Sequence, residues 1–167
     1  MPGNYTVKLI VDGKAYAQPI TIKMDPRVKT TKQDLQQQFD LSYQCYNDEI
    51  SIHKTLKQFY KLNTHLTKFQ NIKNKDIAAQ ITDLTNSLDK LANPKSENYI
   101  GALSGTLAGC AGNIQGADVA PTTQQIKSVN DVHEKFIKSQ LLWETLKSKL
   151  EILNHSLKKE GIDVIRL

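Results

Sequence analysis

The residues best suited to chemistry in this chain of 167 residues are its four histidines, two cysteines and 17 acidic residues. A di-iron or di-manganese centre in a helical bundle needs Glu-x-x-His on two helices and an inward glutamate from each of two more. The sequence has no Glu-x-x-His, and the nearest pair is Glu49 with His53, four residues apart. Because this is also the spacing of an ordinary contact on a helix surface, we expect a surface pair and no metal site.

The remaining histidines and the cysteines are isolated in the sequence. His65, His133 and His155 occur singly, and His133 adjoins an apolar helical series, so we expect it to be partly buried with a hydrogen-bond partner. Cys45 and Cys110 form no Cys-x-x-Cys pair for zinc or redox chemistry. The predicted register of the helices places them at different heights along a bundle, so a disulfide between them is not expected.

Other catalytic and cofactor-binding patterns are missing from the sequence. No glycine-rich phosphate loop follows a strand. Asp48 and Glu49 are adjacent on a predicted helix and so point in different directions, whereas a glycosidase needs two carboxylates that face each other across a cleft. We therefore predict no catalytic, cofactor-binding or metal-binding residue, and no cofactor.

The charge comes from lysine. Twenty-two Lys and Arg against 17 Asp and Glu give a formal charge of +5, and Arg27 and Arg166 are the only arginines. Arginine is the residue that forms bidentate contacts with guanine and phosphate, and the lysines are scattered, so we expect no nucleic-acid partner. The chain has the composition of a folded soluble domain, and no signal-peptide pattern opens it.

A glycine series raises the question of a membrane helix. Gly101, Gly105 and Gly109 are spaced by four residues within the uncharged stretch 98–117. Five glycines and several polar side chains leave this stretch too little apolar surface for a membrane span. We expect the glycines to form a flat strip that lets a neighbouring helix approach closely, against Phe136 and Trp143.

The first 28 residues have the alternation of a β-hairpin. Tyr5, Val7, Leu9 and Val11 share one face, and Asp12-Gly13 is a strong signal for a type I′ turn. A two-residue turn there pairs Val11 with Lys14, Leu9 with Tyr16, Val7 with Gln18 and Tyr5 with Ile20. Pro19 indicates an edge strand or a bulge. Because a two-stranded hairpin is marginal in water, its apolar face needs a cover from the helices, from another copy or from upstream strands.

The rest of the chain has helical spacing. The predicted first helix begins after Thr30-Thr31 and ends near Phe69, with a turn at 71–74. Its apolar stripe consists of Leu35, Phe39, Tyr46, Ile50, Ile52, Leu56, Phe59, Leu62 and Leu66. The second helix contains the series Ile77, Ile81, Leu84, Leu88 and Leu91, and ends at Asn93-Pro94. The third runs from about Glu97 to Gln115. Thr122 caps the fourth, with the series Val129, Val132, Phe136, Ser139, Trp143, Leu146, Leu150, Leu153 and Leu157, and Gly161 ends it.

The helix lengths predict the assembly. The first and last helices, of roughly 38 residues, span about 57 Å, and the two middle ones match that length only when they lie end to end. The sequence therefore predicts a mainly α fold: an elongated antiparallel bundle over residues 29–167, with two long helices and a broken middle helix, preceded by a hairpin over residues 1–28.

The hairpin and the helix starts also resemble a known family. The resemblance is to the C-terminal region of bacterial sortilin-type, BNR-repeat β-propeller proteins that are often labelled glycosyl hydrolases. It rests on Pro2-Gly3-x-Tyr5-x-Val7-x-Leu9-x-Val11-Asp12-Gly13, Pro19-Ile20, Ile22, Asp25-Pro26-Arg27-Val28, Asp34-Leu35-Gln36-x-Gln38-Phe39 and Gly116-Ala117-Asp118-x-Ala120-Pro121-Thr122.

The resemblance implies a position in a larger protein. There, a propeller comes first, an immunoglobulin-like (Ig-like) sheet follows, and residues 1–28 form its terminal strands, with a periplasmic or extracellular location. The expected function is a non-catalytic helical interaction or structural module, whose partner is the upstream domain, another protein or a second copy through the hairpin. The alternative is an accessory part of a glycoside hydrolase that contributes to the parent's active site.

Overall fold

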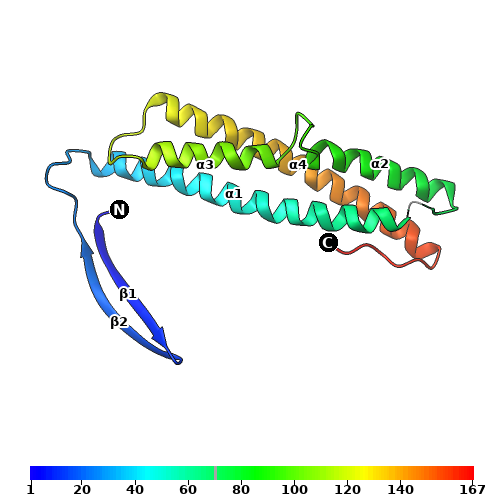
Figure 1. The fold of residues 1–167 in the computed structure, drawn as a ribbon, viewed down its shortest axis with the longest axis horizontal. Coiled ribbons are helices and arrows are strands. Elements are labelled where there is room, and N and C mark those ends of the chain that lie inside the picture. The colour runs from blue at the N-terminus through cyan, green and yellow to red at the C-terminus, as the bar shows by residue number, and fades with distance from the viewer. Residues whose placement is uncertain (70) are drawn as a thin grey trace.

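The computed structural model describes residues 1–69 and 71–167 and is mainly α-helical, with a β-hairpin at the N-terminus (Figure 1). The helices α2 and α3 follow one another end to end beside the two long helices α1 and α4, so the bundle is elongated (Figure 1). The predicted fold class, with its broken middle helix, is therefore confirmed. The elements in chain order are β1 (Gly3–Val11), β2 (Lys14–Ile22), α1 (Lys32–Leu66), the 3-10 helix η1 (Thr67–Phe69), α2 (Lys75–Ala92), α3 (Gly101–Gln115) and α4 (Thr123–Lys159).

The hairpin has the predicted register. β1 and β2 pair antiparallel with Leu9 opposite Tyr16 and Tyr5 opposite Ile20. Asp12 and Gly13 have φ angles of 49° and 78°, as a type I′ turn requires at both central positions. The hairpin extends away from the bundle (Figure 1). The helices of this chain therefore leave its apolar face uncovered.

Capping residues define the starts of the helices. The side chains of Thr31 and Asn74 accept hydrogen bonds from the first turns of α1 and α2. Thr122 and Gln125 form a complete capping box at the start of α4, as their spacing predicted. The predicted turn at 71–74 is confirmed in its described residues, since α2 begins at Lys75.

The third helix begins later than predicted, at Gly101 rather than near Glu97. The chain turns after Asn93, and the Ile100 N–H donates to the carbonyl of Leu91 at 3.0 Å. This bond joins the end of α2 directly to the start of α3, so residues 94–100 form a connection rather than a helical turn. The last helix ends as predicted: Gly161 has a φ of 69°, and the Ile162 N–H donates to the Leu157 carbonyl at 2.9 Å.

The core runs the whole length of the bundle. Every residue of the predicted apolar series of α2 and α4 is buried. Phe59 on α1 and Trp143 on α4 pack edge to face at its centre, with ring centroids 4.8 Å apart. In α1 the prediction was partly wrong, because Phe39 and Tyr46 are 47% and 57% exposed. The residues of α1 that are buried outside the predicted stripe include Leu41, Cys45, Asp48 and Thr55.

In the described part of the chain, no helix has the length and apolar character needed to cross a membrane.

Candidate functional site

An extended row of exposed apolar side chains lies on the hairpin. Side chains alternate between the two faces of a strand, so the register places seven large apolar residues on one face, which we call the apolar hairpin face. Each of the seven is between 43% and 60% exposed. They are Tyr5, Val7, Leu9, Val11, Tyr16, Ile20 and Ile22.

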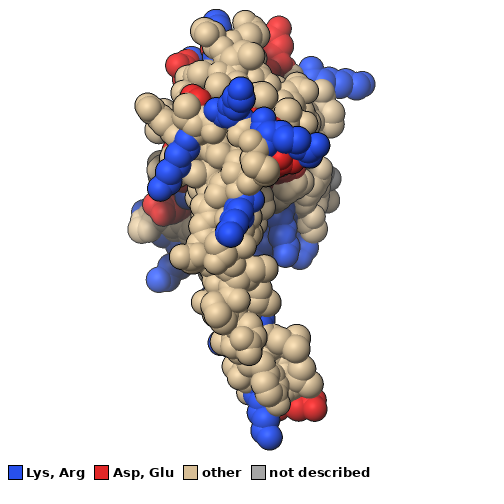
Figure 2. Space-filling model, turned by 90° about the vertical axis from the view of Figure 1, so that its left-hand side faces the viewer, with Lys and Arg blue, Asp and Glu red and all other residues tan. Residues whose placement is uncertain are grey.

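Charged side chains are sparse on the hairpin. In the view of Figure 2 the hairpin is almost free of Lys, Arg, Asp and Glu except near its tip, whereas both signs of charge are scattered over the bundle. The charged residues of the strands and turn are Lys8, Asp12 and Lys14. Lys14 is the one that shares the apolar hairpin face, at its tip. The rest of this face is uncharged.

A short linker, residues 23–31, connects the hairpin to the bundle. The Thr30 hydroxyl donates to the carbonyl of Asp118 in the α3–α4 loop. In the linker, the Arg27 guanidinium binds Asp25 at 2.6 Å and lowers the pKa of that carboxyl. A small cavity of about 180 Å³ between the linker and the bundle is lined by Met24, Phe39 and the buried Ser42, among others. The Thr30–Asp118 hydrogen bond joins this linker to the bundle, and both strands remain exposed to solvent.

His133, one of the four histidines weighed in the sequence analysis, is hydrogen-bonded to another helix. The Nδ1–H of His133 donates to Asp48 across the α1–α4 interface, with 2.6 Å between Nδ1 and Oδ2. The prediction of a partly buried His133 with a hydrogen-bond partner is confirmed. The missed partner, Asp48, had a signal in the sequence: it continues the spacing of Leu41 and Cys45 by three residues.

Glu49 and His53 form the expected surface pair, with 3.8 Å between Oε1 and Nε2 and an imidazole that is 64% exposed. The same carboxylate accepts a hydrogen bond from Ser104 on α3, at 3.2 Å. His65 lies in the last turn of α1, and His155 is exposed on α4. Among the described residues, no three or more His, Cys, Asp and Glu side chains are grouped so that they would hold a metal ion.

The sequence analysis placed the two cysteines at different heights along the bundle, and this prediction was wrong. Gln38 of α1 donates to the carbonyls of Ile114 and Ala117 at 2.6 Å each, and Ser104 donates to Glu49. This antiparallel register brings Cys45 level with the part of α3 that contains Cys110. Burial raises the pKa of the Cys45 thiol to about 11, and the nearby Cys110 adds to that shift. Both cysteines are free thiols.

The glycine strip was also predicted wrongly. Gly105, Gly109 and Gly112 are exposed, and a methyl group at any of them would meet nothing within 4 Å. Gly105 and Gly109 each lie two residues from the buried Leu107, which is about 200° around the helix. They therefore face away from the bundle, and Trp143 packs on Phe59 instead.

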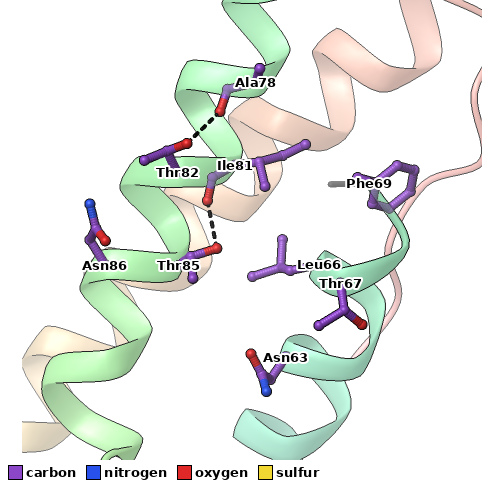
Figure 3. A pocket seen from close by; sticks show the side chains of 9 residues that line it. All are labelled: Asn63, Leu66, Thr67, Phe69, Ala78, Ile81, Thr82, Thr85 and Asn86. Atoms are coloured by element: carbon purple, nitrogen blue, oxygen red, sulfur yellow. Dashed lines mark hydrogen bonds between the residues drawn. The ribbon is translucent and has the colours of Figure 1, made fainter. Parts of the chain in front are cut away.

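A cavity of about 360 Å³ lies between the end of α1, η1 and α2 (Figure 3). Its lining residues are apolar or neutral. The hydroxyls of Thr82 and Thr85 donate to carbonyls of their own helix, at 2.9 and 2.8 Å. The amides of Asn63 and Asn86 remain as polar groups along its wall (Figure 3). This lining supplies no acid, base or thiol for a reaction.

An aromatic ladder on α1 was missed by sequence reasoning. Phe39 stacks on Tyr43 with centroids 5.7 Å apart, and Tyr43 on Tyr46 at 6.2 Å. All three rings are about half exposed. Their spacing of four and three residues was the available signal. The predicted core stripe contained Phe39 and Tyr46 but not Tyr43.

No protein-family model, no curated protein and no solved structure matches this chain.

Proposed function

We propose that this chain is a non-catalytic interaction and structural module, in which the helical bundle is a rigid support and the hairpin docks onto another β-structure. One observation carries the proposal: seven large apolar side chains on one face of a two-stranded sheet are exposed, and no helix of the chain packs on them. Solvent-exposed apolar surface of this kind marks an interaction site.

The size of the surface supports a stable contact. Seven side chains that are each about half exposed leave on the order of 700 Å² open, close to the roughly 800 Å² that each partner contributes to a standard interface. An isolated two-stranded hairpin is also marginal in water, whereas three or more strands with a hydrophobic face are stable. A partner that adds strands would therefore cover the exposed apolar side chains and also stabilise the hairpin as part of a larger sheet.

The resemblance to sortilin-type β-propeller proteins suggests which β-structure this is. In a protein of that kind, the hairpin would supply the last strands of an Ig-like sheet upstream, and the bundle would follow as a C-terminal arm. The helices α1 and α4, of 35 and 37 residues, would give that arm a length of roughly 50–55 Å. A secreted or periplasmic parent is part of the same proposal.

The coding sequence upstream of Met1 provides the test. We expect it to encode a β-rich domain that continues into this chain, and we would express the longer protein beside the present one. Hydroxyl-radical footprinting with mass spectrometry would compare the oxidation of Tyr5, Leu9 and Tyr16 in the two proteins. These residues should become several-fold less reactive in the longer protein, whereas the exposed Leu141 on α4 serves as the internal control and should not change.

Two results would overturn the proposal. One is a longer protein in which Tyr5, Leu9 and Tyr16 are oxidised as fast as in the isolated chain. The other is an upstream sequence that encodes no β-domain joined to Met1.

A further inference from the structure

The two outer edges of the hairpin differ in their backbone chemistry. In a hairpin closed by a two-residue type I′ turn, the residues that flank the turn exchange both backbone hydrogen bonds, and every second pair after them does the same. Val11 and Lys14 flank the turn here. The odd-numbered residues of β1 and the even-numbered residues of β2 therefore bond to each other. The remaining N–H groups point outward, from Asn4, Thr6, Lys8 and Ile10 on β1 and from Ala15, Ala17 and Thr21 on β2.

Pro19 lies in the outward-pointing set of β2. It pairs with Thr6 in the register, at a position where neither residue bonds to the other strand. Because proline has no N–H, it removes a donor from the outer edge of β2 and none from the bonds within the hairpin. A strand that approached β2 would meet a missing donor and the proline ring in the middle of the edge, which is why proline is confined to edge strands.

The outer edge of β1 has no such interruption. Its four outward N–H groups follow one another from Asn4 to Ile10. The side chain of Asn4 accepts a hydrogen bond from Thr21 across the hairpin at 2.8 Å, so it does not cap the edge. Lys8 stands on the face opposite the apolar one, and side chains stand roughly perpendicular to a sheet, which leaves its backbone groups accessible.

We propose that the outer edge of β1 is the docking edge of the hairpin, and that it binds an extended β-strand with alternating apolar side chains. This inference rests on the proposed function and identifies the edge through which that docking takes place. The added strand pairs with the outward N–H and C=O groups of β1. Its apolar residues lie flush with Tyr5, Val7 and Leu9 and extend the apolar hairpin face, while β2 remains the outermost strand.

The exposed surface favours a strand over a helix as the occupant. A helix laid on the apolar hairpin face would cover the side chains but leave the four N–H groups of β1 unpaired. A strand satisfies these groups, brings the sheet to the three strands at which a hydrophobic face becomes stable, and belongs to a sheet whose second layer can cover the face. Recognition of this kind draws its affinity from main-chain hydrogen bonds and its specificity from alternate side chains.

Two matched proline variants test the proposal. Lys8 and Ala17 are cross-strand partners, and each has its N–H pointing outward, so Lys8→Pro and Ala17→Pro each remove one outward donor at the same level of the hairpin. The probe is a fluorescein-labelled synthetic peptide with the sequence of residues 3–11, whose apolar residues alternate as the proposal requires. Its binding to the full chain is measured by fluorescence anisotropy.

We expect saturable binding that falls about tenfold or more in Lys8→Pro, since a lost hydrogen bond and the proline ring both act on the edge. Binding should change less than about twofold in Ala17→Pro and in Lys8→Ala, the control for the lost charge. Equal losses in the two proline variants, or no binding of the peptide to the unaltered chain, would overturn the proposal.

Hydrogen exchange gives a readout that does not depend on a variant. The peptide should slow the exchange of the Thr6, Lys8 and Ile10 amides but not of Ala15 and Ala17, and the reverse pattern would also overturn the proposal.

The proposal for the docking edge and the proposed function can be tested independently. If the longer protein covers Tyr5 and Tyr16 while the Lys8 amide still exchanges freely, the proposed function is supported and the outer edge of β1 is rejected as the docking edge.

Discussion

Asp48 and His133 connect the two long helices of the bundle from within its interface. The imidazole Nδ1 lies 2.6 Å from the carboxylate Oδ2, and the Asp48 side chain is only 8% exposed whereas that of His133 is 36% exposed. The pair therefore combines a buried acceptor with a donor that reaches the surface. An aspartate occupies a core position of α1 because His133 satisfies it there.

Removing this buried acceptor should destabilise the protein. Asp48→Ala leaves Nδ1 of His133 without its partner and opens a small gap, and we expect a loss of about 2–3 kcal/mol in the free energy of unfolding. Urea denaturation followed by circular dichroism measures it. The exposed pair of Lys127 and Asp131 on α4 is the matched control, and Asp131→Ala should cost below about 1 kcal/mol. Similar losses in the two variants would contradict the structural role of Asp48.

Replacing the exposed glycines of α3 by alanine should stabilise the protein, because these glycines have helical backbone angles. Gly105→Ala and Gly109→Ala should each stabilise the protein by about 0.5–1 kcal/mol, because the residues are helical, the added methyl group meets nothing within 4 Å and alanine has the higher helix propensity. The melting temperature would rise accordingly.

At Gly161 the same substitution by alanine should destabilise the protein. Space around it is equally open, but its φ of 69° is unfavourable for alanine, so Gly161→Ala should cost about 1 kcal/mol. Destabilisation by Gly105→Ala would instead show that the glycine strip packs against another surface.

The buried Cys45 thiol should make stability depend on alkaline pH. Its pKa of about 11 in the folded protein lies above the ordinary value of 9.0, so the unfolded chain loses this proton first. The stabilising contribution is fully present below about pH 9 and is lost as the pH rises towards 11.

The measurement compares two cysteine variants with the unaltered chain. Between pH 8 and 11 the unaltered chain should lose about 2 kcal/mol more unfolding free energy than Cys45→Ala. Cys110→Ala should retain most of the extra loss, because burial of Cys45 is the first cause of its shift. An identical pH profile for Cys45→Ala and the unaltered chain would contradict this assignment.

Local patterns predicted most of the fold because each one has a single physical meaning here. The turn Asp12-Gly13 sets the hairpin register, and Thr122 with Gln125 sets the start of α4. The apolar series of α2 and α4 have one side to bury, so their spacing identifies the core residues. The exposed hairpin face was predicted as a surface in need of a cover, and the structure leaves it open.

The errors came from features that depend on how helices face each other. Phe39 and Tyr46 have the spacing of a core stripe, but the rotation of α1 buries Cys45 and Asp48 instead. Partners such as Asp48 and His133 are 85 residues apart, so their contact follows from packing rather than from any local pattern. The exposure of Gly105 and Gly109 could have been predicted from helix geometry, because Leu107 marks the buried side of α3 and both glycines lie about 200° from it.

Two phenylalanines of α1 share the predicted apolar stripe but differ in burial, so their contributions to stability should differ. Phe59 is 1% exposed and packs on Trp143, whereas Phe39 is 47% exposed and touches Tyr43 at the surface. Phe59→Ala should therefore cost about 3–5 kcal/mol through lost burial and a cavity, and Phe39→Ala about 0.5 kcal/mol. Urea denaturation measures both losses of unfolding free energy. The fluorescence of Trp143 should shift only in Phe59→Ala. A large loss in Phe39→Ala would mean that the aromatic ladder is covered in solution, and the exposed face of α1 would then be an interface.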